Sequence, residues 1–155
     1  MQYISPLNTV PTTFPKKIAL MGSTGTIGSN ALAVIRESKE FFQVIALAGG
    51  KNVKKLAEQA NEFTPPYLAL QFEQDIPKLK ELLKPRYAPV ILHGKQGYSQ
   101  ISSLQETDIV LSAQVGAAGL AATVSAVSAG KHVALANKES LVLAGGYLRK
   151  LAHEK

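Results

Sequence analysis

Three glycines at intervals of three residues follow a short apolar run near the beginning of the chain. They belong to the stretch GSTGTIG, residues 22–28, directly behind the apolar residues IALM. Where such a turn joins a strand to a helix, the backbone N–H groups at the helix start can hold a pyrophosphate. We therefore predict a dinucleotide-binding turn, with plain turn chemistry as the alternative.

Each glycine of this turn has a predicted task. Gly22 allows the tight turn out of the strand, and Gly25 leaves the backbone N–H groups open to phosphates. Gly28 lets the helix lie close to the strand, and Ile27 is expected to begin the apolar face of that helix. The spacing G-x-x-G-x-x-G becomes specific only with a strand before it and a helix after it. The hydroxyl groups that could add donors belong to Ser23, Thr24 and Thr26.

A lysine follows the second apolar run, where NAD sites usually carry an acid that binds the ribose 2′-hydroxyl. No acid occurs between Glu40 and Glu58, and the run instead leads into Gly50, Lys51 and Asn52. A cation at this place suits a 2′-phosphate, which favours NADP over NAD. The alternative is a solvated lysine in the first turn of a helix, beside a flexible Gly-Gly turn.

A third polar group leaves the apolar run HVALA at Asn137, Lys138 and Glu139. Ligands of α/β sheets bind at the carboxyl ends of the strands. Lys138 could hold an anionic group of a substrate, while Asn137 and Glu139 could bind the nicotinamide ribose. These residues could equally begin a helix, with Asn137 as N-cap and Glu139 in the first turn. Both roles can hold at once.

Other catalytic and metal-binding chemistry has little support in this sequence. Cysteine is absent, and the three histidines are scattered without the spacing of metal ligands. Asp75 and Asp108 are the only aspartates. Magnesium and manganese prefer clustered oxygen ligands, so we predict no metal ligands and no catalytic residues in these 155 residues.

The elements that must position these groups alternate between strand and helix. Strands are expected at 16–21, 43–48, 67–71, 89–93, 108–113 and 132–136. Helices are expected at 26–38, 52–63, 76–83, 116–129, 138–143 and 147–153, and GKQGYSQISSL is predicted to be a loop with one helical turn. This alternation predicts an α/β fold: a Rossmann-like, doubly wound, mainly parallel sheet with helices on both faces. We expect residues 1–15 to be a flexible leader and 16–155 to be one domain.

The charge and the apolar content exclude other classes of function. The formal net charge is +6, but the lysines are spread along the chain without an aromatic cluster, so no nucleic-acid partner is predicted. Residues 109–130 carry no charge and are numerous enough to span a bilayer. Because they are rich in Ala, Gly and Ser, we predict a buried strand and a packed helix there, and no membrane association.

Four segments together resemble the amino-terminal NADPH-binding domain of the 1-deoxy-D-xylulose 5-phosphate reductoisomerase family: GSTGTIGSNALAVIR, AGGKNV, VGAAGL and ALANKESLV. The resemblance covers nearly everything from residue 16 to 155. It implies an enzyme that rearranges 1-deoxy-D-xylulose 5-phosphate and reduces it with NADPH to 2-C-methyl-D-erythritol 4-phosphate, in non-mevalonate isoprenoid biosynthesis. A divalent metal, Mg or Mn, holds the substrate oxygens in this family.

The resemblance also implies roles for individual residues. Thr24, Gly25, Thr26 and Ile27 would line the NADPH phosphates. The ribose phosphate on the adenine side would be held by Gly50, Lys51 and Asn52. Asn137 and Glu139 would contact NADPH near the nicotinamide, and Lys138 would contact the substrate.

This chain departs from the family in its length. The family's metal-binding carboxylates lie in an Asp-Ser-Glu segment beyond ANKESLV, which this sequence does not contain. We therefore expect a cofactor-binding fragment that is inactive alone, from a bacterial cytoplasmic enzyme that is a homodimer at full length. The alternatives are another NADP-dependent oxidoreductase, such as a semialdehyde dehydrogenase or a dicarboxylate reductase, a non-catalytic dinucleotide sensor, and a purely structural α/β module.

Overall fold

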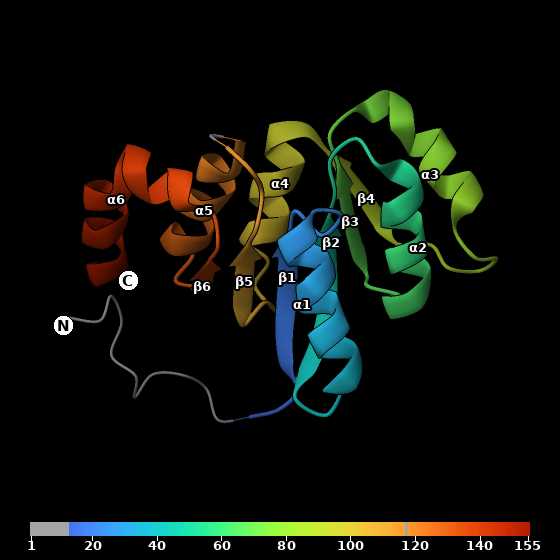
Figure 1. Ribbon diagram of the computed structural model, residues 1–155, viewed down its shortest axis with the longest axis horizontal. Helices are drawn as coiled ribbons and strands as arrows, with labels where there is room; N and C mark the ends of the chain where they lie inside the picture. The colour runs from blue at the N-terminus through green and yellow to red at the C-terminus, as the bar shows by residue number, and fades with distance from the viewer. Residues whose placement is uncertain (1–12, 117) are drawn as a thin grey trace.

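Six strands form one sheet in a computed structural model that describes residues 13–116 and 118–155. The strand order is β4-β3-β2-β1-β5-β6, and every neighbouring pair is parallel (Figure 1). The strands are β1 (Lys16–Met21), β2 (Phe42–Ala48), β3 (Tyr67–Leu70), β4 (Val90–His93), β5 (Ile109–Ser112) and β6 (His132–Leu135). The chain builds outward from β1 to β4 in one direction, and then returns to place β5 and β6 on the other side of β1.

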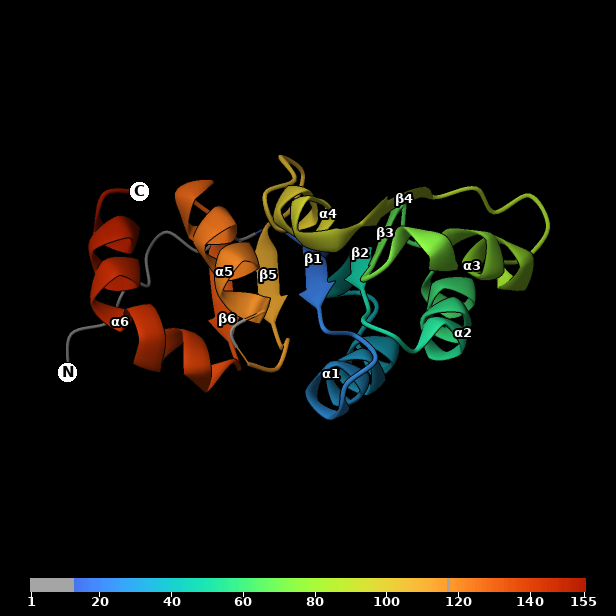
Figure 2. The same cartoon turned by 90° about the horizontal axis from the view of Figure 1, so that it is seen from above.

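Helices cover both faces of this sheet. They are α1 (Thr26–Glu37), α2 (Val53–Phe63), α3 (Ile76–Leu82), α4 (Gly94–Ser102), α5 (Ala118–Ser128) and α6 (Lys138–His153), with a short 3₁₀ turn η2 (Glu73–Asp75) before α3. Seen from above, α1 and α2 lie on one side of the strands and α4 and α5 lie on the other, while α6 lies beyond β6 (Figure 2). The predicted Rossmann-like, doubly wound architecture is confirmed.

Side-chain size separates the two faces of the sheet. Leu20, Leu47 and Leu68 are buried against α1 and α2. Their neighbours along the strands are smaller on average and face α4 and α5 in a second core cluster, which includes Ala19, Ala46, Ala48 and Ala69. Successive residues of a strand point to opposite faces, so uniformly apolar strands give each face its own core.

Helix α4 corrects a prediction, because GKQGYSQISSL was expected to be a loop with one helical turn. Glycine disfavours helices, and this segment contains two. In the structure one has a role in the backbone conformation and the other in packing. Gly94 begins the helix with φ +64°, and a Cβ on Gly97 would lie 2.9 Å from Cβ of Leu92. The close packing of α4 on β4 therefore outweighs its weak intrinsic helix preference.

One further difference concerns helix α1. Ile27 was expected to begin the apolar face of α1, but it is 48% exposed, and the buried residues of this helix are Gly28, Leu32 and Ile35. The two helices predicted at 138–143 and 147–153 are the two parts of α6. They meet at a kink where Ala144 leaves helical geometry, with φ −144° and ψ 23°.

The predicted leader falls mostly outside the described residues, which begin at residue 13. Phe14 packs edge-on against Phe41, with ring centroids 5.5 Å apart. The uncharged stretch forms strand β5 and helix α5, as predicted. Among the helices described here, none combines the length and the apolar character needed to cross a bilayer.

Candidate functional site

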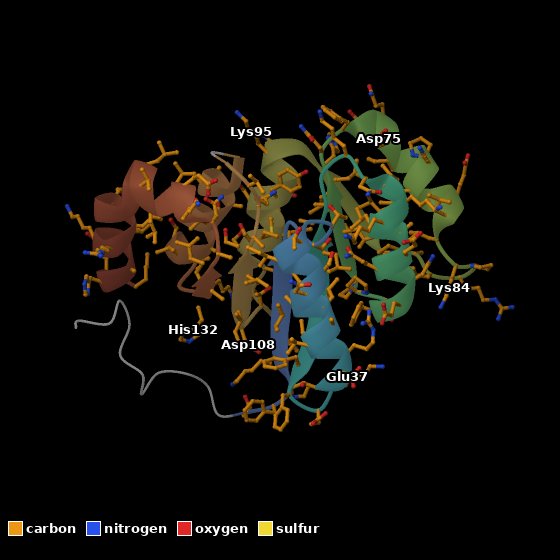
Figure 3. The ribbon with its side chains drawn as sticks, in the orientation of Figure 1. Glu37, Asp75, Lys84, Lys95, Asp108 and His132 are labelled. Atoms are coloured by element: carbon orange, nitrogen blue, oxygen red, sulfur yellow. The ribbon has the colours of Figure 1, made fainter. Side chains whose placement is uncertain are left out.

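A cavity of 770 Å³ lies where the strands end at their carboxyl edge. It lies at β1, where the strand order reverses, with β2 on one side and β5 on the other. This is the usual ligand position in doubly wound sheets. Lys95 marks this edge at the top of Figure 3, and Asp108 marks the opposite edge. The lining residues are Gly22, Thr24, Gly25, Gly49, Gly50, Gln71, Phe72, Gly94, Lys95, Tyr98, Ala113, Gln114, Val115, Leu120 and Ala121.

The turn after β1 is packed tightly against backbone atoms. Gly22 has φ +86°, and a Cβ on it would lie 2.6 Å from the carbonyl oxygen of Ala113. A Cβ on Gly28 would lie 2.3 Å from the Gly22 carbonyl oxygen. The N–H groups of Gly22 and Ser23 both donate to the carbonyl of Ala48, at 2.8 and 2.9 Å. The predicted tight turn and close approach are therefore confirmed, although Gly28 approaches the turn itself and not the strand.

Helix α1 presents its N-terminus beside this turn. Gly25 occupies the N-cap position without a side-chain cap, and the first turn of the helix carries no acidic residue. The first amides of a helix have no intrahelical acceptor and carry a partial positive charge. Thr26 and Ile27 are exposed there, so their N–H groups fit a bound phosphate.

Ser23 is the predicted donor of this turn that the structure buries. It is fully buried, its hydroxyl has no hydrogen-bond partner among the described residues, and it does not line the cavity. Its carbonyl accepts a hydrogen bond of 2.9 Å from Nε2 of Gln59, which belongs to α2. Donation by the Ser23 hydroxyl to a ligand therefore stays a prediction. Gln59 was missed, although it lies on the buried side of α2, three residues after Leu56.

The turn after β2 contains Gly49, whose N–H and carbonyl are both hydrogen-bonded, and Gly50, which has open space around it. Gly49 donates to the carbonyl of Ala69 at 2.9 Å and accepts a hydrogen bond of 2.8 Å from the hydroxyl of Tyr98. A Cβ on Gly50 would meet nothing within 4 Å. Lys51 is exposed and lies one residue before the N-cap of α2, so phosphate binding and the alternative of a solvated lysine at the helix start both stay predictions.

Helix α2 begins with positive charge only. Asn52 is its N-cap, and Oδ1 of this residue accepts a hydrogen bond of 3.0 Å from the N–H of Lys55. The first turn contains Lys54 and Lys55 and no acid. Together with Lys51, these groups give the end of β2 a charge that suits a phosphate monoester.

Asn137 performs the helix-start role that the sequence left open. It is buried and caps α6, with Oδ1 accepting from the N–H of Ser140 at 2.9 Å. Its Nδ2 donates to the carbonyls of Gln114 and Gly116, at 2.5 and 2.9 Å. Both amide hydrogens are therefore engaged, and the residue reaches the cavity only through Gln114.

Lys138 and Glu139 lie near the start of α6, exposed and half-buried respectively. Neither they nor Asn137 are among the described residues that line the cavity. The structure thus brings Gly22, Thr24, Gly25, Gly49 and Gly50 together in one cavity. The predicted residues that follow these turns are outside the lining, as the third group is: Thr26, Ile27, Lys51 and Asn52. In the described part of the chain, no three His, Asp or Glu residues gather as a metal site.

Several lining residues were missed, two of them because α4 was predicted to be a loop. Lys95 and Tyr98 belong to this helix, while Gln71 and Phe72 follow β3. Polar residues that follow parallel strands gather at one edge of the sheet. This signal also identifies Lys95, which follows β4. Burial raises the pKa of Tyr98 to about 12, so its hydroxyl is a neutral donor near pH 7.

A second hollow, of 530 Å³, lies between β6, α5 and α6. Its lining includes Val133, Leu141 and Arg149 and none of the predicted site residues. It opens beside the unpaired edge of β6, away from the glycine turns. The candidate nucleotide site is therefore the cavity at the carboxyl edge.

Comparison with known sequences identifies related proteins over most of this chain. The family model of 1-deoxy-D-xylulose 5-phosphate reductoisomerase matches residues 18–145. A reductoisomerase of Oleidesulfovibrio alaskensis is 52% identical over 154 residues, which are 98% of this chain and 38% of that protein. One from Lawsonia intracellularis is 54% identical over 138 residues, 89% of this chain and 34% of that protein.

Solved structures agree with the sequence comparison. A DOX-P reductoisomerase in complex with NADPH, fosmidomycin and magnesium has a TM-score of 0.85 at 38% identity, over 90% of this chain and 34% of that one. The Zymomonas mobilis enzyme in complex with NADPH has a TM-score of 0.85 at 35% identity, over 91% of this chain and 37% of that one. This chain thus spans little more than a third of the length of these relatives. It belongs to the 1-deoxy-D-xylulose 5-phosphate reductoisomerase family.

Proposed function

We propose that residues 16–155 form the NADPH-binding domain of a reductoisomerase that converts 1-deoxy-D-xylulose 5-phosphate to 2-C-methyl-D-erythritol 4-phosphate. The observation that carries this proposal is the meeting of both glycine turns in one cavity, in a family with solved NADPH complexes. NADPH would supply the hydride for the reduction. Membership of the family removes the alternatives of a semialdehyde dehydrogenase and a dicarboxylate reductase.

The two ends of the cavity fit the two phosphate groups of NADPH. The pyrophosphate would lie at the start of α1, against Thr24, Gly25, Thr26 and Ile27. Thr26 and Ile27 would offer backbone N–H groups and the threonines their hydroxyls, while the N–H of Gly25 already donates to the Gly22 carbonyl at 3.1 Å. The turn of Gly22 and Gly28 keeps side chains out of that position. The 2′-phosphate would lie at the start of α2, against Gly50, Lys51 and Asn52.

The nicotinamide would extend toward the loop between β5 and α5, which contributes Gln114 and Val115 to the cavity. We propose that Glu139 contacts the cofactor there and that Lys138 binds an anionic group of the substrate. Asn137 would act mainly by holding the Gln114 loop, because both of its amide hydrogens are already engaged.

The metal of this reaction does not fit the described residues, which bring no three acidic or histidine side chains together. We expect no turnover by the 155-residue chain, even with Mg²⁺ or Mn²⁺. A homodimer and a location in the bacterial cytoplasm, both implied by the family resemblance, are part of the same proposal.

Calorimetric titration of this chain with NADPH and with NADH tests the proposal. NADPH should bind more tightly, and Lys51→Ala should remove about 1.5–3 kcal/mol of that preference, the value of a charge-assisted hydrogen bond. Lys84→Ala is the matched control, because this exposed lysine lies far from the cavity (Figure 3). Failure of both cofactors to bind, or equal binding of both in every variant, would contradict the proposal.

A further inference from the structure

We propose that Tyr98 is a positioning residue for recognition of the 2′-phosphate: its hydroxyl holds the Gly49-Gly50 turn, which lines the cavity, and so fixes the position of Lys51 and the start of α2 next to it. The inference rests on the proposed binding of NADPH. It assigns a role to a side chain on α4, which lies on the opposite face of the sheet from α2 (Figure 2).

The contact that carries this inference joins two distant parts of the chain. Tyr98 donates from its hydroxyl to the carbonyl of Gly49 at 2.8 Å, across 49 residues of sequence. The Gly49 peptide is buried, and its N–H donates to Ala69 on β3 at 2.9 Å. No second donor to that carbonyl is present in the described chain. Tyr98 therefore holds the carbonyl of Gly49, whereas β3 holds its N–H.

The turn needs such a contact because packing does not restrain it on both sides. A Cβ on Gly49 would contact Thr24 and Leu56, at 3.2 and 3.3 Å, but one on Gly50 would meet nothing within 4 Å. Glycine has the largest conformational freedom to lose on folding. Lys51 follows directly, so the direction of its side chain depends on how the Gly49 peptide is held.

Tyr98 is itself well placed to hold the turn. Its ring packs against the core cluster that contains Ala48 and Ala69. Ala48 is the last residue of β2, and Ala69 is the second-last residue of β3. Gly97 brings this part of α4 close to β4. Burial keeps the pKa of Tyr98 high, at about 12, so the hydroxyl retains its proton and donates at neutral pH.

Tyr87 provides a matched control within the same chain. Its hydroxyl also donates to a backbone carbonyl, that of Pro65 at 2.7 Å. Burial raises its pKa to about 12 as well. Neither Tyr87 nor Pro65 is among the described residues that line the cavity. Tyr87→Phe therefore removes an equivalent hydrogen bond from the fold without touching the turn.

The test compares NADPH and NADH binding by the wild-type chain, Tyr98→Phe and Tyr87→Phe, after thermal unfolding has shown that all three fold. Tyr98→Phe should weaken NADPH binding about fivefold and leave NADH binding nearly unchanged. Tyr87→Phe should change neither. Amide hydrogen exchange at Gly50 and Lys51 should become faster in Tyr98→Phe only, and this measurement needs no ligand.

A double-mutant cycle with Lys51→Ala makes the test sharper. The effect of Tyr98→Phe on NADPH binding should disappear in the Lys51→Ala background, because the two residues serve the same phosphate. Three results would overturn the proposed role of Tyr98 and leave the proposed function intact. They are equal losses of NADPH and NADH affinity, additive effects in the cycle, and unchanged exchange at Gly50. If the wild-type chain binds neither cofactor, the proposed function fails and this inference fails with it.

Discussion

The two glycine turns that border the cavity are held by different means. The turn after β1 is enclosed by backbone: added Cβ atoms on Gly22 and Gly28 would lie 2.6 and 2.3 Å from carbonyl oxygens. The turn after β2 has open space around Gly50 and is held by a hydrogen bond from Tyr98 to Gly49. One turn is thus shaped by steric exclusion, and the other by a single side chain from elsewhere in the fold.

This difference separates what each glycine contributes. At Gly28 the absence of a side chain is a condition for folding, because the obstructing atoms are backbone and cannot move aside cheaply. At Gly50 the absence of a side chain leaves room above the turn, which a bound phosphate could use. Stability should therefore depend on the first turn, and nucleotide selectivity should depend on the second.

The largest effect should come from Gly28→Ala. Its Cβ would lie 2.3 Å from the Gly22 carbonyl oxygen, so the turn or the helix must shift, at a cost of about 3 kcal/mol. Urea denaturation measures the change in the free energy of unfolding. Gly50→Ala is the control and should lie within about 1 kcal/mol of the wild type. Similar losses in both variants would remove the distinction between the turns.

A smaller effect should follow from Gln59→Leu. This substitution removes the donor that satisfies the Ser23 carbonyl at 2.9 Å, which should cost about 1 kcal/mol of the free energy of unfolding. The cost is limited because Oε1 of Gln59 is itself unpaired among the described residues. An unchanged free energy in urea would mean that the hydroxyl of Ser29, 3.5 Å from the same carbonyl, replaces the lost donor.

The smallest effect concerns alkaline pH. Burial raises the pKa of both Tyr98 and Tyr87 to about 12 in the folded chain, against roughly 10 when unfolded. Their contribution to stability is therefore complete below about pH 10 and is lost as the pH rises toward 12. Urea denaturation across this range should show a shallower loss in Tyr98→Phe than in the wild type. An unaltered pH dependence would indicate that Tyr98 is not buried in solution.

The sequence predicts most of this fold because the information is local. Strand β1 was predicted at residues 16–21 and occupies Lys16–Met21. Buried parallel strands are uniformly apolar, and here each strand except β2 begins directly after a proline or a charged residue. Helix α4 escaped prediction because Gly94 and Gly97 lower the local helix preference. What stabilises it is tertiary packing, in which Gly97 and Ile101 are buried, and local helix preference does not reveal such packing.

The residues of the candidate site also divide into those with a local sequence signal and those whose partners are distant in the sequence. Gly22 and Gly25 could be assigned from their spacing, because the turn chemistry lies within a few residues. Tyr98 and Gln59 could not, since their partners Gly49 and Ser23 lie 49 and 36 residues away. Asn137 lies between these cases: its local role as N-cap was foreseen as an alternative, but its contact with Gln114 across 23 residues was not.

The central position of β1 sets the order in which the cavity walls become available during synthesis. One neighbour, β2, follows within a few tens of residues, whereas β5 arrives much later: the N–H of Lys17 bonds Asp108 across 91 residues. Pairings between distant residues form slowly, because a long loop must close first. On the ribosome, the half of the site formed by the two glycine turns should therefore emerge first. NADPH should be unable to bind fully until the β5 half has left the exit tunnel.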